Sequence, residues 1–187
     1  MRSIIGLIGE KGSGKQTFVN FLKDLTPDLN IRQVRFSDIL AQTLMLWDLP
    51  NTRENLQKLA IMMNDSFGAQ ALANAAKFSI EGDSSDVIIF DGIRREAELQ
   101  LVKKMPDHKL IYITADQNLR YERLKKRSEK VGEAGLTFEQ FLAEEDSKAE
   151  KLISLLGKEA DIKIENNKDI LEFREKIKEF AKSCILS

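Results

Sequence analysis

The stretch Gly9-Glu10-Lys11-Gly12-Ser13-Gly14-Lys15-Gln16-Thr17 decides the fold that the sequence predicts. It lies between an apolar run, residues 3–8, and a segment of helical pattern, residues 18–23. A glycine-rich loop that joins a strand to a helix is the sequence context of a phosphate-binding loop. Its glycines allow a tight turn that brings backbone N–H groups close to an anion, and the following helix adds the positive end of its dipole. We expect Lys15 to serve the β and γ phosphates of a nucleoside triphosphate.

The residue after Lys15 departs from the usual pattern. A serine or threonine directly after the lysine normally places its hydroxyl on Mg²⁺, but here Gln16 follows and Thr17 comes next. An amide does not replace that hydroxyl, so we expect the metal contact to be displaced or made through water. A glycine turn without a ligand is the alternative, which the agreement of spacing, lysine and flanks disfavours. The predicted nucleotide-binding residues of the loop are Gly9, Gly12, Ser13, Gly14, Lys15, Gln16 and Thr17.

Length and composition limit the class of protein. The chain has 187 residues, enough for one domain with a small insert and a sizeable core. Charged residues make up 32% and the net charge is −1, so we expect neither a nucleic acid nor a membrane as partner. The single cysteine excludes an intramolecular disulfide, and the single histidine argues against histidine-based metal or triad chemistry. Without a long apolar run, and with a strand at the start, we expect a cytoplasmic protein.

Apolar runs alternate with helical patterns along the rest of the chain. We predict further strands at residues 31–36, 87–90 and 110–113 and a weaker, more polar one at 160–164. Such alternation predicts an α/β fold of three layers, the P-loop NTPase fold: a five-stranded parallel sheet with helices on both faces and the ligand crevice at the carboxyl ends of the strands. Residues 37–80 are predicted to form consecutive helices inserted between two strands.

Several reactive side chains follow predicted strand ends. Asp91 comes after four apolar residues, as expected of the carboxylate that orients the water shell of Mg²⁺ opposite the phosphate loop, although a turn aspartate is the alternative. Thr17 and Asp91 are therefore the predicted metal contacts. Ser37 and Asp38 follow the second strand and are expected to cap a helix at residues 39–47. Asp38 has two further candidate roles, as a base for a hydroxyl acceptor or as a contact to the sugar or base of the acceptor.

Three arginines share one face of a predicted helix. Arg120, Arg123 and Arg127 are spaced at i, i+3 and i+7. A solvated basic face is the default interpretation, and the acidic stretch at residues 144–146 is a candidate partner for it. The alternative is a clamp on the transferred phosphoryl group, which we assign to Arg123 and Arg127 rather than to Arg120.

Two motifs make the comparison with known kinases specific. The ending Gly-Lys-Gln-Thr resembles the Gly-Lys-Gly-Thr of adenylate-kinase-type nucleoside monophosphate kinases, in which the hydroxyl also lies two residues after the lysine. Asp91-Gly92-Ile93-Arg94-Arg95 resembles that family's Asp-Gly-Phe-Pro-Arg, which implies that Arg95, with Arg94 beside it, binds the acceptor phosphate. The run from Arg123 to Arg127 resembles Arg-Leu-x-x-Arg, which implies that a short lid follows at residues 128–148.

The acceptor region resembles this family less closely. Ser37-Asp38-Ile39-Leu40 resembles the start of the acceptor-binding helices, but the arginine expected next is replaced by Ala41, and Arg53 is the candidate replacement. Residues 160–167 resemble a segment of dephospho-CoA kinases and of archaeal adenylate-kinase-like proteins, which implies a place for Asn166 in the nucleotide site. Phe36-Ser37-Asp38 is similar to a motif of phage-type deoxynucleotide kinases.

These resemblances imply a kinase that uses ATP and Mg²⁺ to phosphorylate a nucleoside or deoxynucleoside monophosphate. Its predicted parts are a core (residues 1–36, 86–127 and 149–187), an acceptor-binding insert (37–80) and a lid (128–148). The partner is a small-molecule phosphate acceptor, and the chain is expected to be a monomer or a homodimer. A dephospho-CoA kinase and an ATP-binding switch with slow hydrolysis remain the alternatives.

Overall fold

A computed structural model describes residues 2–126, 137–146 and 148–186. Its five strands form one parallel sheet in the order β2-β3-β1-β4-β5. They are β1 (Ser3–Ile8), β2 (Ile31–Arg35), β3 (Val87–Ile93), β4 (His108–Thr114) and β5 (Ile162–Glu165). The predicted five-stranded parallel sheet is confirmed, and β2 lies at its edge as its alternating pattern indicates.

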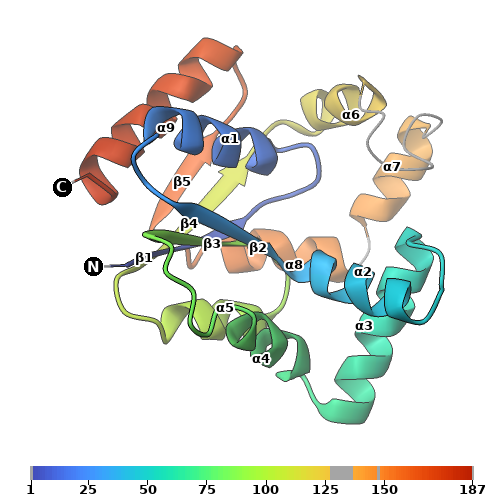
Figure 1. Ribbon diagram of the computed structural model, residues 1–187. Helices are drawn as coiled ribbons and strands as arrows, with labels where there is room; N and C mark the ends of the chain where they lie inside the picture. The colour runs from blue at the N-terminus through green and yellow to red at the C-terminus, as the bar shows by residue number, and fades with distance from the viewer. Residues whose placement is uncertain (1, 127–136, 147, 187) are drawn as a thin grey trace.

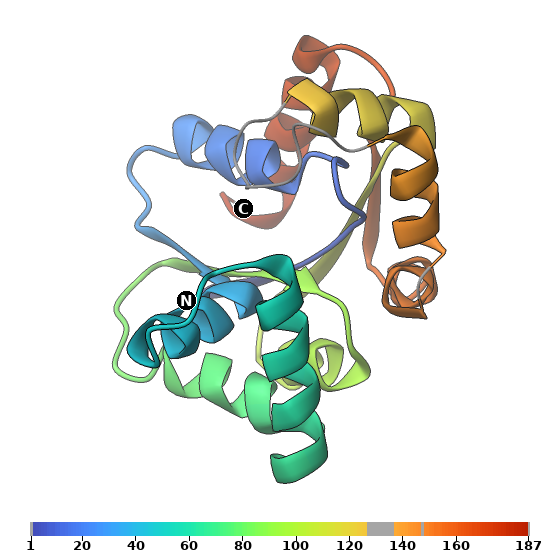
Figure 2. The same ribbon diagram turned by 90° about the vertical axis from the view of Figure 1, so that its right-hand side faces the viewer.

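Helices cover both faces of the sheet (Figure 1). One face is covered by α1 (Lys15–Leu25) and α9 (Ile170–Cys184), and the other by α2 (Phe36–Leu46), α3 (Arg53–Phe67), α4 (Ala71–Phe78), α5 (Glu96–Lys103) and α8 (Lys148–Gly157). The remaining described helices are α6 (Gln117–Lys126) and α7 (Phe138–Glu145). In Figure 2, α2, α3 and α4 lie away from α6 and α7. The three-layer α/β architecture is that of P-loop NTPases.

The core is divided by the sheet into two apolar clusters. Alternate residues of β1 serve opposite clusters, because successive side chains of a strand point to opposite faces. Ile5 and Leu7 join the α1–α9 side, and Ile4 and Ile8 join the α2–α5 side. Phe90 of β3 is fully buried and stacks on Phe36 with 6.1 Å between ring centroids. The central strands are apolar on both faces because helices cover both.

Two predicted boundaries are wrong in a way that affects the site. β2 continues into α2 without a turn, so the helix begins at Phe36 with Arg35 as its N-cap. Ser37 and Asp38 therefore lie in the first helical turn and do not cap the helix. β3 continues beyond Phe90 to Ile93, with a register shift that opposes Leu7 to Asp91 and Ile8 to Ile93. Gly92, at a φ of 85°, is the extra residue of this bulge.

Among the described residues, no helix is both long enough and apolar enough to span a lipid bilayer.

We predict that Phe90→Ala lowers the free energy of unfolding by about 3–5 kcal/mol, because a fully buried ring leaves a cavity. Urea unfolding of the variant and the wild type measures the difference. Phe67→Ala is the matched control, since that ring is 78% exposed in the structure, and its effect should stay within about 0.5 kcal/mol. Equal losses in both variants would contradict the assignment of Phe90 to the core.

Candidate active site

The phosphate loop leads from the carboxyl end of β1 into α1, as the sequence predicts. Gly12 and Gly14 have φ angles of 73° and 109°, which side chains other than glycine rarely adopt. A Cβ on Gly9 would lie 2.3 Å from the carbonyl oxygen of Ile113, so this glycine is also required by packing. Gly14 is the N-cap of α1 and provides no side-chain cap, which leaves the first turn of the helix suited to an anion.

Lys15 is held over this loop. Its Nζ donates hydrogen bonds to the carbonyl oxygens of Gly9 at 2.6 Å and Glu10 at 2.9 Å. The ammonium group therefore lies close to the loop backbone, where the phosphates of a nucleotide would be bound. Ser13 is fully buried and its Oγ has no hydrogen-bond partner among the described residues.

Asp91 lies beside the loop strand, because Leu7 of β1 is its register partner. Its carboxylate is mostly buried: Oδ2 accepts a hydrogen bond from Nε2 of Gln33 at 2.7 Å and lies 3.5 Å from Nε of Arg35. Oδ1 is buried and has no hydrogen-bond partner among the described residues. A buried carboxylate oxygen without a hydrogen bond costs free energy unless a ligand binds to it.

This orphaned oxygen fits the Mg²⁺ ion that the fold implies. No group of three metal-binding side chains exists among the described residues, so an ion here would need the phosphates and water as further ligands, as is usual for Mg²⁺. Such an ion would supply positive charge to the phosphate oxygens. Asp91 would hold it, directly or through water. Thr17 lies half-buried in the first turn of α1, and its metal contact remains a prediction.

Gln16 is engaged with neighbouring strand and helix residues. Its Oε1 accepts hydrogen bonds from Nε2 of Gln33 at 3.2 Å and from the guanidinium of Arg35, and its Nε2 donates to Asn20 at 2.8 Å. The amide thus links the phosphate loop to β2. Gln33 and Arg35 were not predicted as site residues. The signal that the sequence gives for them is that they are two residues apart in a strand and therefore share one face.

The arginines of α6 have different surroundings. Arg120 is buried, with a nitrogen 2.5 Å from Oε2 of Glu145, so the pairing with the acidic stretch applies to it. Arg123 donates to the backbone oxygen of Asn166 at 2.9 Å and lies 3.5 Å from the carbonyl oxygen of Gly12, and burial lowers the pKa of its guanidinium. Arg123 is therefore next to the phosphate loop. Arg127 lies outside the described residues.

Asn166 fastens the end of β5 to the phosphate loop. Its Nδ2 donates to the carbonyl oxygen of Ser13 at 2.9 Å, and its backbone N–H donates to Thr114 at 2.8 Å. Because Arg123 contacts the same asparagine, the predicted nucleotide residues Ser13, Arg123 and Asn166 come together.

Arg94 and Arg95 follow β3 and lie at the start of α5. Both backbone N–H groups donate to Oε2 of Glu98, at 2.7 and 3.2 Å. Glu98 is buried, and burial is the main cause that raises the pKa of its carboxyl group. Glu98, for which the sequence carries no signal, thus fixes the backbone that presents both arginines.

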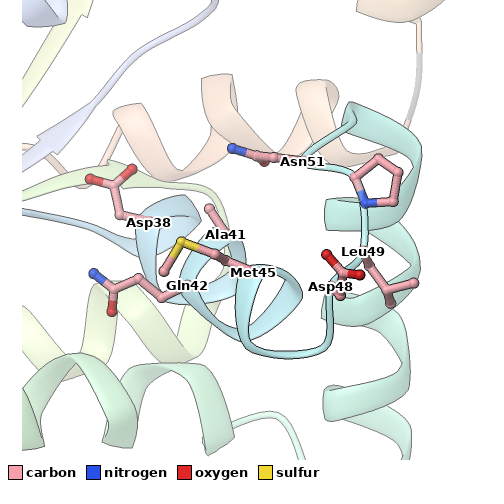
Figure 3. Close-up of a pocket in the computed structure, with 8 residues that line it drawn as sticks. Asp38, Ala41, Gln42, Met45, Asp48, Leu49 and Asn51 are labelled. Carbon is pink, nitrogen blue, oxygen red and sulfur yellow. The ribbon is translucent and has the colours of Figure 1, made fainter.

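A pocket of about 610 Å³ opens beside α2 (Figure 3). Asp38 lies at one end of it and Asp48 and Leu49 at the other, with Ala41, Met45 and Asn51 between them. The full lining is Asp38, Ala41, Gln42, Met45, Asp48, Leu49, Pro50 and Asn51. Ser37 is exposed on the first turn of α2, and Arg53 begins α3 two residues after the pocket lining ends.

We predict that Glu98→Gln changes the pH dependence of stability. The carboxyl pKa is raised above 4.5 in the folded state, so the contribution of Glu98 to stability is most favourable below that value and falls as the pH rises through the folded pKa. The glutamine variant lacks this fall. Urea unfolding of both proteins between about pH 4 and pH 8 measures it. The stability of the variant relative to the wild type should increase over this range, and parallel curves would contradict the prediction.

Known proteins resemble this chain in sequence and in fold. The curated UPF0200 protein of Sulfurisphaera tokodaii is 29% identical over 183 residues, 97% of each chain. Among solved structures, TT1252 of Thermus thermophilus has a TM-score of 0.62 at 18% identity and 98% coverage of both chains. The shikimate kinase of Bacteroides thetaiotaomicron has a TM-score of 0.62 at 11% identity, with 96% of this chain and 97% of that one covered. At such identities these structures show the fold alone.

A family model described as AAA domain matches residues 5–152, from β1 through the phosphate loop, Asp91 and α6 into α8. The matched part includes every element that builds the site except Asn166 at the end of β5. The chain therefore belongs to the AAA domain family.

Proposed function

We propose that this protein transfers the γ-phosphoryl group of ATP to a nucleoside or deoxynucleoside monophosphate. The observation that carries the proposal is the buried Oδ1 of Asp91 beside a phosphate loop, which has no hydrogen-bond partner in the part of the chain that the structure describes. A module that binds a nucleotide but transfers no phosphoryl group needs the phosphate loop. It has less need of a carboxylate beside the loop that can hold a metal ion.

Phosphoryl transfer depends mainly on positioning and on stabilisation of charge. The bond between the γ phosphorus and the β–γ bridging oxygen breaks, and a new bond forms to a phosphate oxygen of the acceptor. In this proposal Lys15 and the first turn of α1 hold the β and γ phosphates. Arg123, with Arg127, stabilises the transferred group, and Arg94 and Arg95 hold the acceptor phosphate.

The pocket beside α2 suits the uncharged part of the acceptor. Its described side chains include two carboxylates, Asp38 and Asp48, and two amides, Gln42 and Asn51, but no cationic group. Such a lining accepts hydrogen bonds from N–H and O–H groups and repels phosphate. Met45 and Leu49 add apolar surface for a ring. We therefore place the base and sugar here, and contacts of Ser37 and Arg53 to the acceptor remain predictions.

A hydroxyl acceptor is the second candidate. Asp38 is exposed at the pocket, where a carboxylate can take the proton of a reacting hydroxyl. Dephospho-CoA carries such a hydroxyl on its ribose, and a structurally similar protein is named shikimate kinase. A nucleotide-binding switch with slow hydrolysis is the third, since Gln16 and Ala41 both depart from the kinase patterns.

The deciding experiment measures ADP release from ATP and Mg²⁺ with one acceptor at a time. The panel contains all ribo- and deoxyribonucleoside monophosphates, dephospho-CoA and shikimate. Rapid turnover with one monophosphate supports the proposal and names the substrate. Turnover only with a hydroxyl acceptor replaces it by the second candidate, and only slow acceptor-independent hydrolysis replaces it by the switch.

We predict that Lys15→Ala lowers kcat by about 10²-fold or more, because the charge that serves the phosphates is lost. Thermal melting should show little loss of folding, since the hydrogen bonds of the ammonium to Gly9 and Glu10 are made in the loop and not in the apolar core. Lys23→Ala is the matched control, because Lys23 is exposed at the other end of α1 and should leave kcat unchanged. Turnover near that of the wild type in Lys15→Ala would refute the site.

We predict that Asp38→Asn separates the two kinase candidates. A monophosphate acceptor is already an anion and needs no base, so kcat should fall by less than about tenfold. A hydroxyl acceptor would lose the base, and kcat should then fall by about 10²–10⁴-fold. The measurement is kcat with the acceptor found in the panel. Asp24→Asn is the control, because Asp24 is exposed on α1 and does not line the pocket, so kcat should be unchanged.

A further inference from the structure

Two side chains of β2 connect Asp91 to the phosphate loop. Gln33 donates to both Asp91 and Gln16, and Arg35 contacts the same two residues. Gln33 and Arg35 point to the same face because they alternate along the strand, and Arg35 is the register partner of Asp91 on β3. The result is one network of four side chains at the carboxyl end of the sheet.

Arg32 of the same strand provides a comparison. It lies on the opposite face, where NH1 is 2.5 Å from Oδ2 of Asp83 and NH2 donates to the carbonyl oxygen of Ser79 at 2.6 Å. Both partners belong to the segment after α4, so Arg32 ties β2 to the insert. It takes no part in the contacts of Asp91 described here.

Arg35 occupies a different position. It is the last residue of β2, its side chain is 41% exposed, and three residues later Asp38 lines the pocket beside α2. Its guanidinium touches Gln16, the residue after Lys15. Arg35 therefore lies between the proposed donor site and the proposed acceptor site.

The carboxylate of Asp91 has two candidate positive partners. They are the guanidinium of Arg35 and a divalent cation. A divalent cation bound at Oδ1 would compete with Arg35 for this charge, because the guanidinium is only 3.5 Å from Oδ2. A guanidinium displaced from a carboxylate is well suited to phosphate oxygens, which it binds with two parallel N–H groups. Gln16 reaches β2 because its side chain is long, which a serine or threonine in its place would not do.

We propose that Arg35 is a catalytic residue of this chain. In the free protein it neutralises Asp91. With a divalent cation held at Asp91, the guanidinium of Arg35 would be available to the phosphoryl group in transfer, and Gln16 is the residue that positions this guanidinium. This inference rests on the proposed phosphoryl transfer and gives the departure at Gln16 a function.

The first test measures binding and needs no acceptor. Mn²⁺ is titrated into protein saturated with ADP, and bound Mn²⁺ is followed by electron paramagnetic resonance. Arg35→Gln should bind Mn²⁺ on the order of tenfold more tightly than the wild type, because the competing cation is gone. Arg32→Gln is the matched control and should bind Mn²⁺ as the wild type does. Equal affinities of Arg35→Gln and the wild type would overturn the competition between Arg35 and the metal.

The second test measures turnover with the acceptor found in the panel. Arg35→Gln should lower kcat by about 10²-fold or more with little change in the KM for ATP, as expected for a charge used in the transition state. Arg35→Lys should recover part of kcat, and Arg32→Gln should retain it. An Arg35→Gln variant with wild-type kcat would overturn the catalytic role.

The role of Gln16 is tested by a double-mutant cycle. Gln16→Ala should lower kcat by about tenfold alone and have little further effect in the Arg35→Gln background, because both changes disturb one guanidinium. Full additivity would overturn the positioning role. A wild-type protein that binds no ADP with Mn²⁺ would refute the proposed function itself, whereas failure of the Arg35 variants alone refutes only this inference.

Discussion

The burial of the Asp91 carboxylate near the carboxyl end of β3, an inner strand of the sheet, is the constraint on which the site depends. A buried carboxylate is costly unless charged or polar groups compensate it. Here Gln33 and Arg35 provide the compensation from β2, which must therefore lie next to β3. The strand order β2-β3-β1 thus puts the compensating residues on one side of Asp91 and the phosphate loop on the other.

The same order explains why the helical insert is where it is. β2 and β3 are parallel neighbours, so the chain must return from the carboxyl end of one to the amino end of the other. The helices α2, α3 and α4 make this return, and the first of them starts directly at the strand end. A pocket on α2 is consequently close in sequence to Arg35, and the connection required by the sheet also supplies the candidate acceptor site.

The sequence predicted most of the fold because its signals are local. The loop motif and the uniformly apolar run at residues 87–90 indicate a covered parallel sheet without knowledge of any distant contact. The start of α2 was predicted wrongly because Ser37 and Asp38 resemble a cap, while the actual boundary is set by a strand that enters a helix without a turn. Lys15, Asp91 and Arg123 were predicted from the loop motif, a strand end and a helical spacing, whereas Asn166 was predicted from a family resemblance. Their roles remain predictions.

What was missed depends on lateral neighbours. The alternation of Gln33 and Arg35 shows that they share a face, but only the strand order shows that Asp91 is beside them. Arg120 and Arg123 both fit the helical spacing of one face, but their neighbours differ. Arg120 pairs with Glu145 of α7, whereas Arg123 contacts Asn166. Long-range contacts of this kind have no signature in a single sequence.

One ion pair joins the phosphate loop to α7 directly, and a second joins α6 to α7. Nζ of Lys11 lies 2.7 Å from Oε2 of Glu144, and Arg120, which also contacts the loop carbonyl of Lys11, pairs with Glu145. The loop is thus held by α7 and β5 on one side and by β2 on the other.

On the proposed function, the arginines after β3 attract the anionic end of an acceptor while the carboxylates beside α2 repel it. The charges alone would then orient the acceptor with its phosphate toward the loop, before any specific contact to its base is made.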